Sequence, residues 1–163
     1  MFNTADMSIA EYCRRLGVRE PVPGGGSVNG VCGALACSLA QMVIEYSVDK
    51  KKFAFARKKL QTAKRRFIVL RRRFISLSDK DIESYGAYAA GTGNMKSAVK
   101  KMIHTPQKMS DLAEEALVIL KSLKGRTNQY LDTDLEIAGK LFVMVSVTSM
   151  MNVKTNTKVL ENL

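Results

Sequence analysis

The sequence predicts an all-α protein, and three features support this expectation. β-Branched residues are scattered and never alternate with polar residues over a useful length, so no strand is expected. Apolar residues recur every three or four positions along most of the chain, as they do in helices with one buried face. The three prolines fall in only two places, Pro21/Pro23 and Pro106. We therefore expect residues 1–163 to form one domain, an antiparallel bundle of about five helices.

The first two helices are expected on either side of a glycine-rich loop. Ser8 followed three residues later by Glu11 is a capping-box pattern, which predicts a helix from Ser8 to Leu16. Pro21–Ser27 reads PVPGGGS, which is not regular structure, and Ser27 is a good N-cap for a helix from Val28 to about Tyr46. That helix carries a stripe of small residues, which indicates close packing in the core or in a dimer: Gly30, Gly33, Ala34, Cys37 and Ala40.

Three longer helices are expected after this point. Apolar residues at helical spacing predict a third helix from Lys51 to about Ala89, with a break at residues 91–94. A fourth helical region runs from Met95 to Leu123, where Pro106 should kink or divide it. A last helix is expected from Asp132 or Thr133 to Leu160. Its nearly all-apolar middle, residues 137–151, predicts burial on most sides.

Composition places the chain among soluble globular proteins. Of its 163 residues 46% are apolar and 25% charged. The first seven residues lack the pattern of a signal peptide, and the longest apolar runs, Val31–Leu35 and Leu141–Val147, are too short to cross a bilayer. A cytoplasmic protein that does not bind membranes is therefore expected. Three cysteines and a single histidine, His104, predict reduced core thiols and no metal site.

The net charge of +11 predicts attraction to anions. Much of the charge lies between Lys50 and Arg73, on the polar face of the third predicted helix. The charge alone leaves three partners open, namely nucleic acid, a membrane surface or a polyanionic small molecule.

Four groups of residues could carry chemistry, and each also has a purely structural interpretation. The glycines of the loop before the second helix can bring backbone N–H groups close to a ligand, or can form a plain connector. Asp79, Asp81 and Glu83 could provide a general base or form a solvated helix face. Asp134 could be a residue of a functional site, or its charge could simply stabilise the N-terminus of the last helix. Asn152 and Asn156 share one face of an apolar helix, which favours an inter-helix network or a polar ligand.

Taken together, these motifs resemble a known family. Five motifs occur in this order along the chain: PVPGGGSVNGVCGALACSLAQMV from Pro21, KKKF from Lys50, DIESY from Asp81, TDL from Thr133 and NVKTN from Asn152. This combination resembles the formiminotetrahydrofolate cyclodeaminases and methenyltetrahydrofolate cyclohydrolases, over roughly residues 8–160.

The resemblance implies an all-α homodimer that acts on a tetrahydrofolate derivative, with or without a polyglutamate tail, and needs no further cofactor or metal. It implies that Asp81 is the catalytic acid and that a cationic one-carbon unit lies beside it. The residues it implies for substrate binding are Gly24, Gly25, Gly26, Ser27, Lys51, Lys52, Asp134, Asn152 and Asn156.

The chain also departs from the family pattern. A longer segment containing Leu-Pro-Lys is replaced here by the short residues 90–94, and the family's Ala-Phe is replaced by Ser84-Tyr85. These departures keep open a second interpretation, a folate- or pterin-binding protein without turnover. A third, a basic bundle that binds nucleic acid through residues 50–73, is less favoured because its phenylalanines sit at core spacing.

Overall fold

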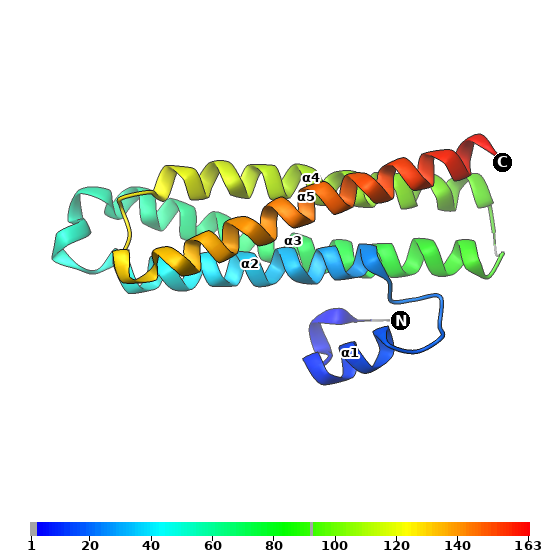
Figure 1. Ribbon diagram of the computed structural model, residues 1–163, viewed down its shortest axis with the longest axis horizontal. Helices are drawn as coiled ribbons and strands as arrows, with labels where there is room; N and C mark the ends of the chain where they lie inside the picture. The colour runs from blue at the N-terminus through cyan, green and yellow to red at the C-terminus, as the bar shows by residue number, and fades with distance from the viewer. Residues whose placement is uncertain (1–2, 92) are drawn as a thin grey trace.

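The structure is a computed structural model, and it describes residues 3–91 and 93–163. Within these residues it contains five α-helices and three short 3-10 helices and no strand, so the predicted fold class is confirmed. Four long helices, α2 to α5, form an up-and-down bundle, and the short α1 lies outside it beside α2 (Figure 1). Thr92 of the predicted break, together with Met1 and Phe2, lies outside the described residues.

The helix boundaries follow the sequence closely at most positions. The elements are η1 (Thr4–Asp6), α1 (Ile9–Leu16), α2 (Gly25–Val48), η2 (Lys51–Ala56), α3 (Arg57–Ala89), α4 (Met95–Leu123), η3 (Gln129–Leu131) and α5 (Asp132–Glu161). The predicted cap of α1 is present, since the Ser8 hydroxyl accepts a hydrogen bond from the Glu11 N–H at 3.1 Å. The predicted third helix starts later than expected, because residues 51–56 form a 3-10 helix with a kink at Phe53.

The start of α2 needs correction, whereas the close packing of its small residues is confirmed. The helix begins at Gly25 with Gly24 as its N-cap, so Ser27 lies inside the first turn and is not the cap. The stripe of small residues packs against α3 of the same chain: a Cβ on Gly30 would lie 2.7 Å from Ser78, and one on Gly33 would lie 2.5 Å from the Phe74 ring. The stripe therefore serves the core of the bundle. Phe74 and Phe67 each stack on Phe142 of α5, with 6.3 Å between ring centroids.

Pro106 does not divide α4, which is one helix from Met95 to Leu123. A proline has no N–H to donate to the carbonyl four residues earlier, which here is Met102. The side-chain amide of Asn156 on α5 donates to that carbonyl at 2.7 Å and replaces the missing bond. The freed carbonyl is thus satisfied by the neighbouring helix, and α4 continues.

The prediction that the apolar middle of α5 is buried on most sides is wrong. One face packs into the bundle through Ala138, Phe142, Val145 and Ser149. On the opposite face Val143 is 50% exposed and Val147 is 56% exposed. α2 and the stretch Gln129–Glu161 are both long and apolar enough to cross a membrane by length and composition, although more than half of the apolar window of α2 is buried inside the bundle.

Candidate functional site

The candidate site is a cleft of about 300 Å³ where the N-terminus of α2 meets the C-terminal parts of α3 and α5. We call it the Asp81 cleft. It is lined by Pro21, Val22, Gly24, Gly25, Gly26, Asp81, Tyr85, Asn152, Thr155 and Asn156. This end of the bundle lies on the right in Figure 1, where the loop before α2 passes beside α3. The cleft thus unites three of the four groups singled out in the sequence.

Asp81 supplies the carboxylate of the cleft, and it lies directly against the start of α2. A Cβ on Gly26 would collide with its carboxylate, so only glycine leaves room for the acid there. The backbone N–H of Ser27 is a hydrogen-bond partner that lowers the pKa of Asp81. Burial outweighs this effect and raises its pKa to about 6. An acid with such a pKa changes protonation state near neutral pH, as a general acid or base must.

The other two acids of the predicted cluster face elsewhere. Asp79 accepts hydrogen bonds from the backbone N–H and the hydroxyl of Thr4, at 2.9 and 2.5 Å, and so fastens η1 to α3. Glu83 lines a separate cavity between α3 and α4. Of the three carboxylates, only Asp81 lines the cleft.

The side chain of Ser27 is hydrogen-bonded to α1 and α3 behind the wall of the cleft. Its hydroxyl is fully buried and lies 2.6 Å from the Tyr12 hydroxyl and 2.9 Å from that of Ser78. The hydroxyl of Ser78 also donates to the Ser27 carbonyl at 3.1 Å. These bonds hold the first turn of α2, and therefore the N–H that Asp81 faces, against α1 and α3. Ser27 is therefore not among the residues that line the cleft, and its part in substrate binding stays a prediction.

The two predicted amides both line the cleft. Asn156 is held by its hydrogen bond to Met102, and Asn152 lies one turn before it on α5. Below them, Asn29 of α2 accepts from the Thr148 hydroxyl at 2.8 Å and donates to Ser149 at 3.2 Å. These bonds join α2 to α5 and fix the wall of the cleft that carries the amides.

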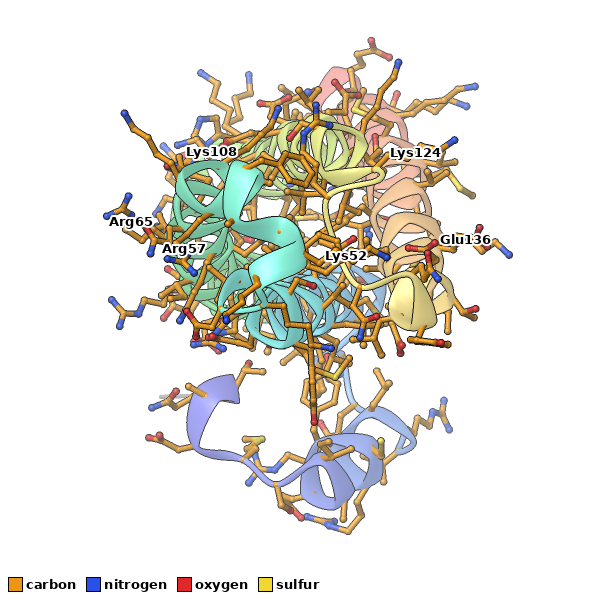
Figure 2. The ribbon with its side chains drawn as sticks, turned by 90° about the vertical axis from the view of Figure 1, so that its left-hand side faces the viewer. Lys52, Arg57, Arg65, Lys108, Lys124 and Glu136 are labelled. Carbon is orange, nitrogen blue, oxygen red and sulfur yellow. The ribbon has the colours of Figure 1, made fainter. Side chains whose placement is uncertain are left out.

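Lys51, Lys52 and Asp134 do not belong to the cleft of their own chain. The two lysines lie in η2, beyond the far end of α2, and a helix of 24 residues is about 36 Å long at 1.5 Å per residue. Asp134 lies 18 residues before Asn152 on α5, or about 27 Å away. Figure 2 looks onto this far end, where Lys52 and Glu136 are labelled.

Basic residues lie toward both ends of the bundle. At the far end Arg65 points into solvent (Figure 2), whereas Nε of Arg57 donates to the Val48 carbonyl at 3.3 Å. Closer to the cleft, a cavity of about 460 Å³ between α3 and α4 is lined by Lys80, Lys101 and His104. Ser84, whose hydroxyl donates to the Asp81 carbonyl, also lines this cavity. This cavity thus carries two lysines and one carboxylate, Glu83, and it shares no lining residue with the Asp81 cleft.

Two side chains of the cleft were missed in the sequence. Tyr85 follows Asp81 by four residues and Thr155 follows Asn152 by three, so each shares a helix face with a predicted residue. That spacing was the available signal. Elsewhere, a cavity of about 800 Å³ lies between α1 and the bundle, lined largely by apolar side chains, and its acid Asp79 is bonded to Thr4. Among the described residues no group of three His, Cys, Asp or Glu side chains could hold a metal ion.

Comparison with known proteins agrees with this architecture. The crystal structure of formiminotetrahydrofolate cyclodeaminase from Thermotoga maritima superimposes with a TM-score of 0.89 at 26% identity, covering 94% of this chain and 80% of that one. Formimidoyltransferase-cyclodeaminases of Rattus norvegicus and Mus musculus are each 23% identical over 167 residues. The match covers 94% of this chain but only 31% of the length of these relatives.

The family model for formiminotransferase-cyclodeaminase matches residues 8–162, which is nearly the whole chain. The matched part includes α1, the glycine loop, Asp81 and both cleft asparagines. The chain therefore belongs to the formiminotransferase-cyclodeaminase family.

Proposed function

We propose that this protein is an enzyme that acts on a one-carbon derivative of tetrahydrofolate. Its substrate is either the 5,10-methenyl form, which it hydrolyses, or the 5-formimino form, which it cyclises with loss of ammonia. The observation that carries the proposal is Asp81, a largely buried acid with a pKa of about 6 set against a helix N-terminus in a cleft. Family membership supports the substrate class.

The charge of Asp81 suits both reactions. The methenyl group and the protonated formimino group are cations, which a nearby carboxylate stabilises. Gly24, Gly25 and Gly26 leave the backbone open to close approach by the ligand, and a Cβ on Gly24 or Gly25 would meet nothing within 4 Å. The amides of Asn152 and Asn156 on the opposite wall can orient the polar edge of the pterin ring.

In the hydrolysis, water attacks the methenyl carbon while Asp81 accepts one of its protons. The bond from that carbon to N5 then breaks as the carbon becomes the formyl group on N10. N5 takes up one of the two protons of the water, and the other leaves to solvent. In the cyclisation, N10 attacks the formimino carbon and the bond to the amino group breaks. Asp81 then carries the N10 proton to the departing ammonia. Both reactions need an acid that changes protonation state near neutral pH.

The direct test follows the absorbance of 5,10-methenyltetrahydrofolate with the native chain, with an Asp81→Asn variant and with buffer alone. We expect the native chain to accelerate the decay and the variant to lose about 10²- to 10⁴-fold of that acceleration, the usual contribution of a general acid or base. The same proteins are then given 5-formiminotetrahydrofolate and ammonia release is measured. No acceleration of either reaction by the native chain would contradict the proposal.

We further propose that the glutamate tail of the folate lies along the cavity between α3 and α4, which we call the α3–α4 groove. Lys80 and Lys101 line this groove together with Glu83, and Ser84 on its wall donates to the backbone carbonyl of Asp81. A polyglutamate tail is a polyanion, which a line of cations attracts and steers. The net charge of +11 adds a general attraction for it.

We also propose that the protein is a homodimer. The exposed apolar side chains of α5, among them Val143 and Val147, form the kind of surface that subunit contacts cover. Sedimentation at micromolar concentration tests this directly. A monomer alone would contradict it.

One observation favours a second candidate, a folate-binding homologue without turnover. The turn between α3 and α4 is short, from Ala90 to Asn94, where the resembled family has a longer segment with Leu-Pro-Lys. Calorimetry with 5-formyltetrahydrofolate separates the candidates. Tight binding together with no turnover of either substrate would favour the binding protein.

A further inference from the structure

An exposed aromatic ring stands at the far end of the bundle, outside the site described above. Phe53, Phe67 and Phe74 sit at core spacing in the sequence, and all three are buried. Phe55 follows the kink of η2 at Phe53 and is 75% exposed. This ring is therefore available to a ligand, which the spacing of the other phenylalanines does not indicate.

Phe55 lies on the wall of a groove of about 690 Å³ between η2, α3 and α4, which we call the Phe55 groove. Ala63 of α3 and Ile119 of α4 give the groove an apolar lining. Lys58 and Lys59 line it as well, three and four residues after the ring, and both are exposed. An aromatic wall with cations beside it suits a flat ligand that carries negative charge.

The lining of the groove has an excess of positive charge. Its carboxylate, Glu115, accepts hydrogen bonds from Nε and Nη2 of Arg66, so these two charges neutralise each other. Among the residues that the structure describes, neither Lys58 nor Lys59 is paired with a carboxylate. The exposed lysines 50–52 extend the positive charge along η2. The groove can therefore hold an anion longer than itself.

We propose that the Phe55 groove binds single-stranded nucleic acid, with a base stacked on Phe55 and backbone phosphates held by Lys58 and Lys59. Every base has a flat face that stacks on an aromatic side chain, and neighbouring lysines bind the phosphates that follow along the strand. A polyglutamate has the charge but no ring to stack. A membrane surface has the charge but is too broad to enter a groove.

The groove also stays open in the homodimer proposed above. Helices α3 and α5 each pack against α2 and α4, so α3 and α5 stand at opposite corners of the bundle. The Phe55 groove lies on the α3 side. A second copy that covers the outer face of α5 therefore leaves the groove accessible.

The first test follows the fluorescence anisotropy of a short labelled oligothymidylate as protein is added. We expect the native chain to bind it, Phe55→Trp to bind at least as tightly, and Phe55→Leu to lose about tenfold in affinity, because leucine keeps the apolar surface but cannot stack. Circular dichroism should show all three proteins equally helical, since the ring is exposed. Unchanged affinity in Phe55→Leu would overturn the inference. So would binding of the native chain to phosphatidylserine vesicles but not to the oligonucleotide.

The second test examines the lysines through the salt dependence of binding. In Lys58→Ala/Lys59→Ala the slope of log affinity against log salt should become shallower by about 1.4, at about 0.7 for each phosphate contact of a single strand. Lys96→Ala/Lys100→Ala is the matched control, because it removes the same charge from exposed positions about 28 Å or more from Ile119 along α4. The control should keep the native slope. Equal slopes in the two double variants would overturn the inference, because overall charge would then explain the binding.

None of these measurements needs a folate, so the inference and the proposed function fail separately. Polyglutamate added at the same concentration of charge should displace little of the oligonucleotide, and complete displacement would overturn the role of stacking. If the native chain turns over a folate but does not bind the oligonucleotide, this inference fails and the proposed function stands. If it binds the oligonucleotide through Phe55 but turns over neither folate, the groove stands and the proposed function fails.

Discussion

At the residue scale, the unusual acid is Asp81, because burial raises the pKa of its carboxyl to about 6 from the usual 3.8. A group whose pKa is higher in the folded chain binds its proton more tightly there. The folded state therefore loses stability as pH rises through this interval, and the full cost is present above about pH 6. The acid is kept in an environment that weakens the fold, which is typical of functional sites.

This acid gives a prediction on stability. Asp81→Asn removes the cost of ionisation, so we expect the variant to be more stable than the native chain at pH 7.5, by at most about 3 kcal/mol at 1.4 kcal/mol per pKa unit. The gain should shrink as pH falls and disappear near pH 4. Thermal unfolding at a series of pH values measures it. The matched control is Asp79→Asn, which removes a charge from the same helix while its Oδ1 still accepts the bonds from Thr4, and it should give no gain; a gain in the control would contradict the explanation.

The glycines of the α2 start give a second prediction. Gly26→Ala would force a methyl group into the Asp81 carboxylate, so we expect it to lower both stability and turnover, the former by about 1–3 kcal/mol as in other overpacked positions. Gly25→Ala is the matched control for stability, because a Cβ at position 25 has no atom within 4 Å. Urea unfolding of the two variants compares them. Equal stabilities would show that the Asp81 side chain moves aside freely.

At the scale of single elements, the sequence predicts the helices well, because helix boundaries depend on local signals. The capping box at Ser8 and the positive-φ glycines Gly91 and Gly125 act within a few residues. The effect of Pro106 is different. It depends on Asn156, fifty residues later, which local patterns do not connect to the proline.

That long-range pair can be tested as a double-mutant cycle. Asn156→Leu leaves the Met102 carbonyl without its partner, and an unsatisfied buried polar group costs about 1–3 kcal/mol. Pro106→Ala supplies the missing backbone N–H, so in its presence the same Asn156→Leu change should cost much less. Urea unfolding of the four proteins gives the coupling energy. Additive effects would show that Asn156 does not substitute for the proline's missing bond.

The candidate site was only partly predictable for a related reason. Asp81, the glycines and the two asparagines were found because each stands out locally. Lys51, Lys52 and Asp134 were misplaced within the single chain, since a motif fixes order along the sequence but not distance in a bundle whose helices exceed 30 Å. The burial of α5 was overestimated because apolarity does not indicate which molecule covers a face.

At the scale of the whole molecule, basic residues in different parts of the bundle contribute differently to the binding of an anion. Arg65 points into solvent in the part of the bundle far from the cleft (Figure 2). Lys80 and Lys101 line the α3–α4 groove together with Glu83. The net charge speeds the encounter with any anion, whereas the two lysines of the groove would select the long anionic tail that we propose for the ligand.

This division gives a prediction on substrate length. Lys101→Glu should weaken binding of a pentaglutamyl folate at least tenfold and leave that of the monoglutamyl form nearly unchanged, because only the longer tail reaches along the groove. Arg65→Glu makes the same change of charge at the far end and should affect both forms alike. Calorimetry at two salt concentrations measures these affinities. Equal losses for both variants would show that overall charge, not the groove, holds the tail.

The raised pKa of Asp81 has a further consequence for how ligand binding is coupled to protons. Near pH 6 about half of the free molecules hold a proton on this carboxyl. A cationic ligand favours the ionised form, so its binding should release about half a proton per site at that pH and almost none at pH 8. Binding heats measured in buffers of different ionisation enthalpy would reveal this release. The affinity for the cation should accordingly decrease as the solution becomes acidic. The cleft should therefore release a cationic ligand more readily at acidic pH than at neutral pH.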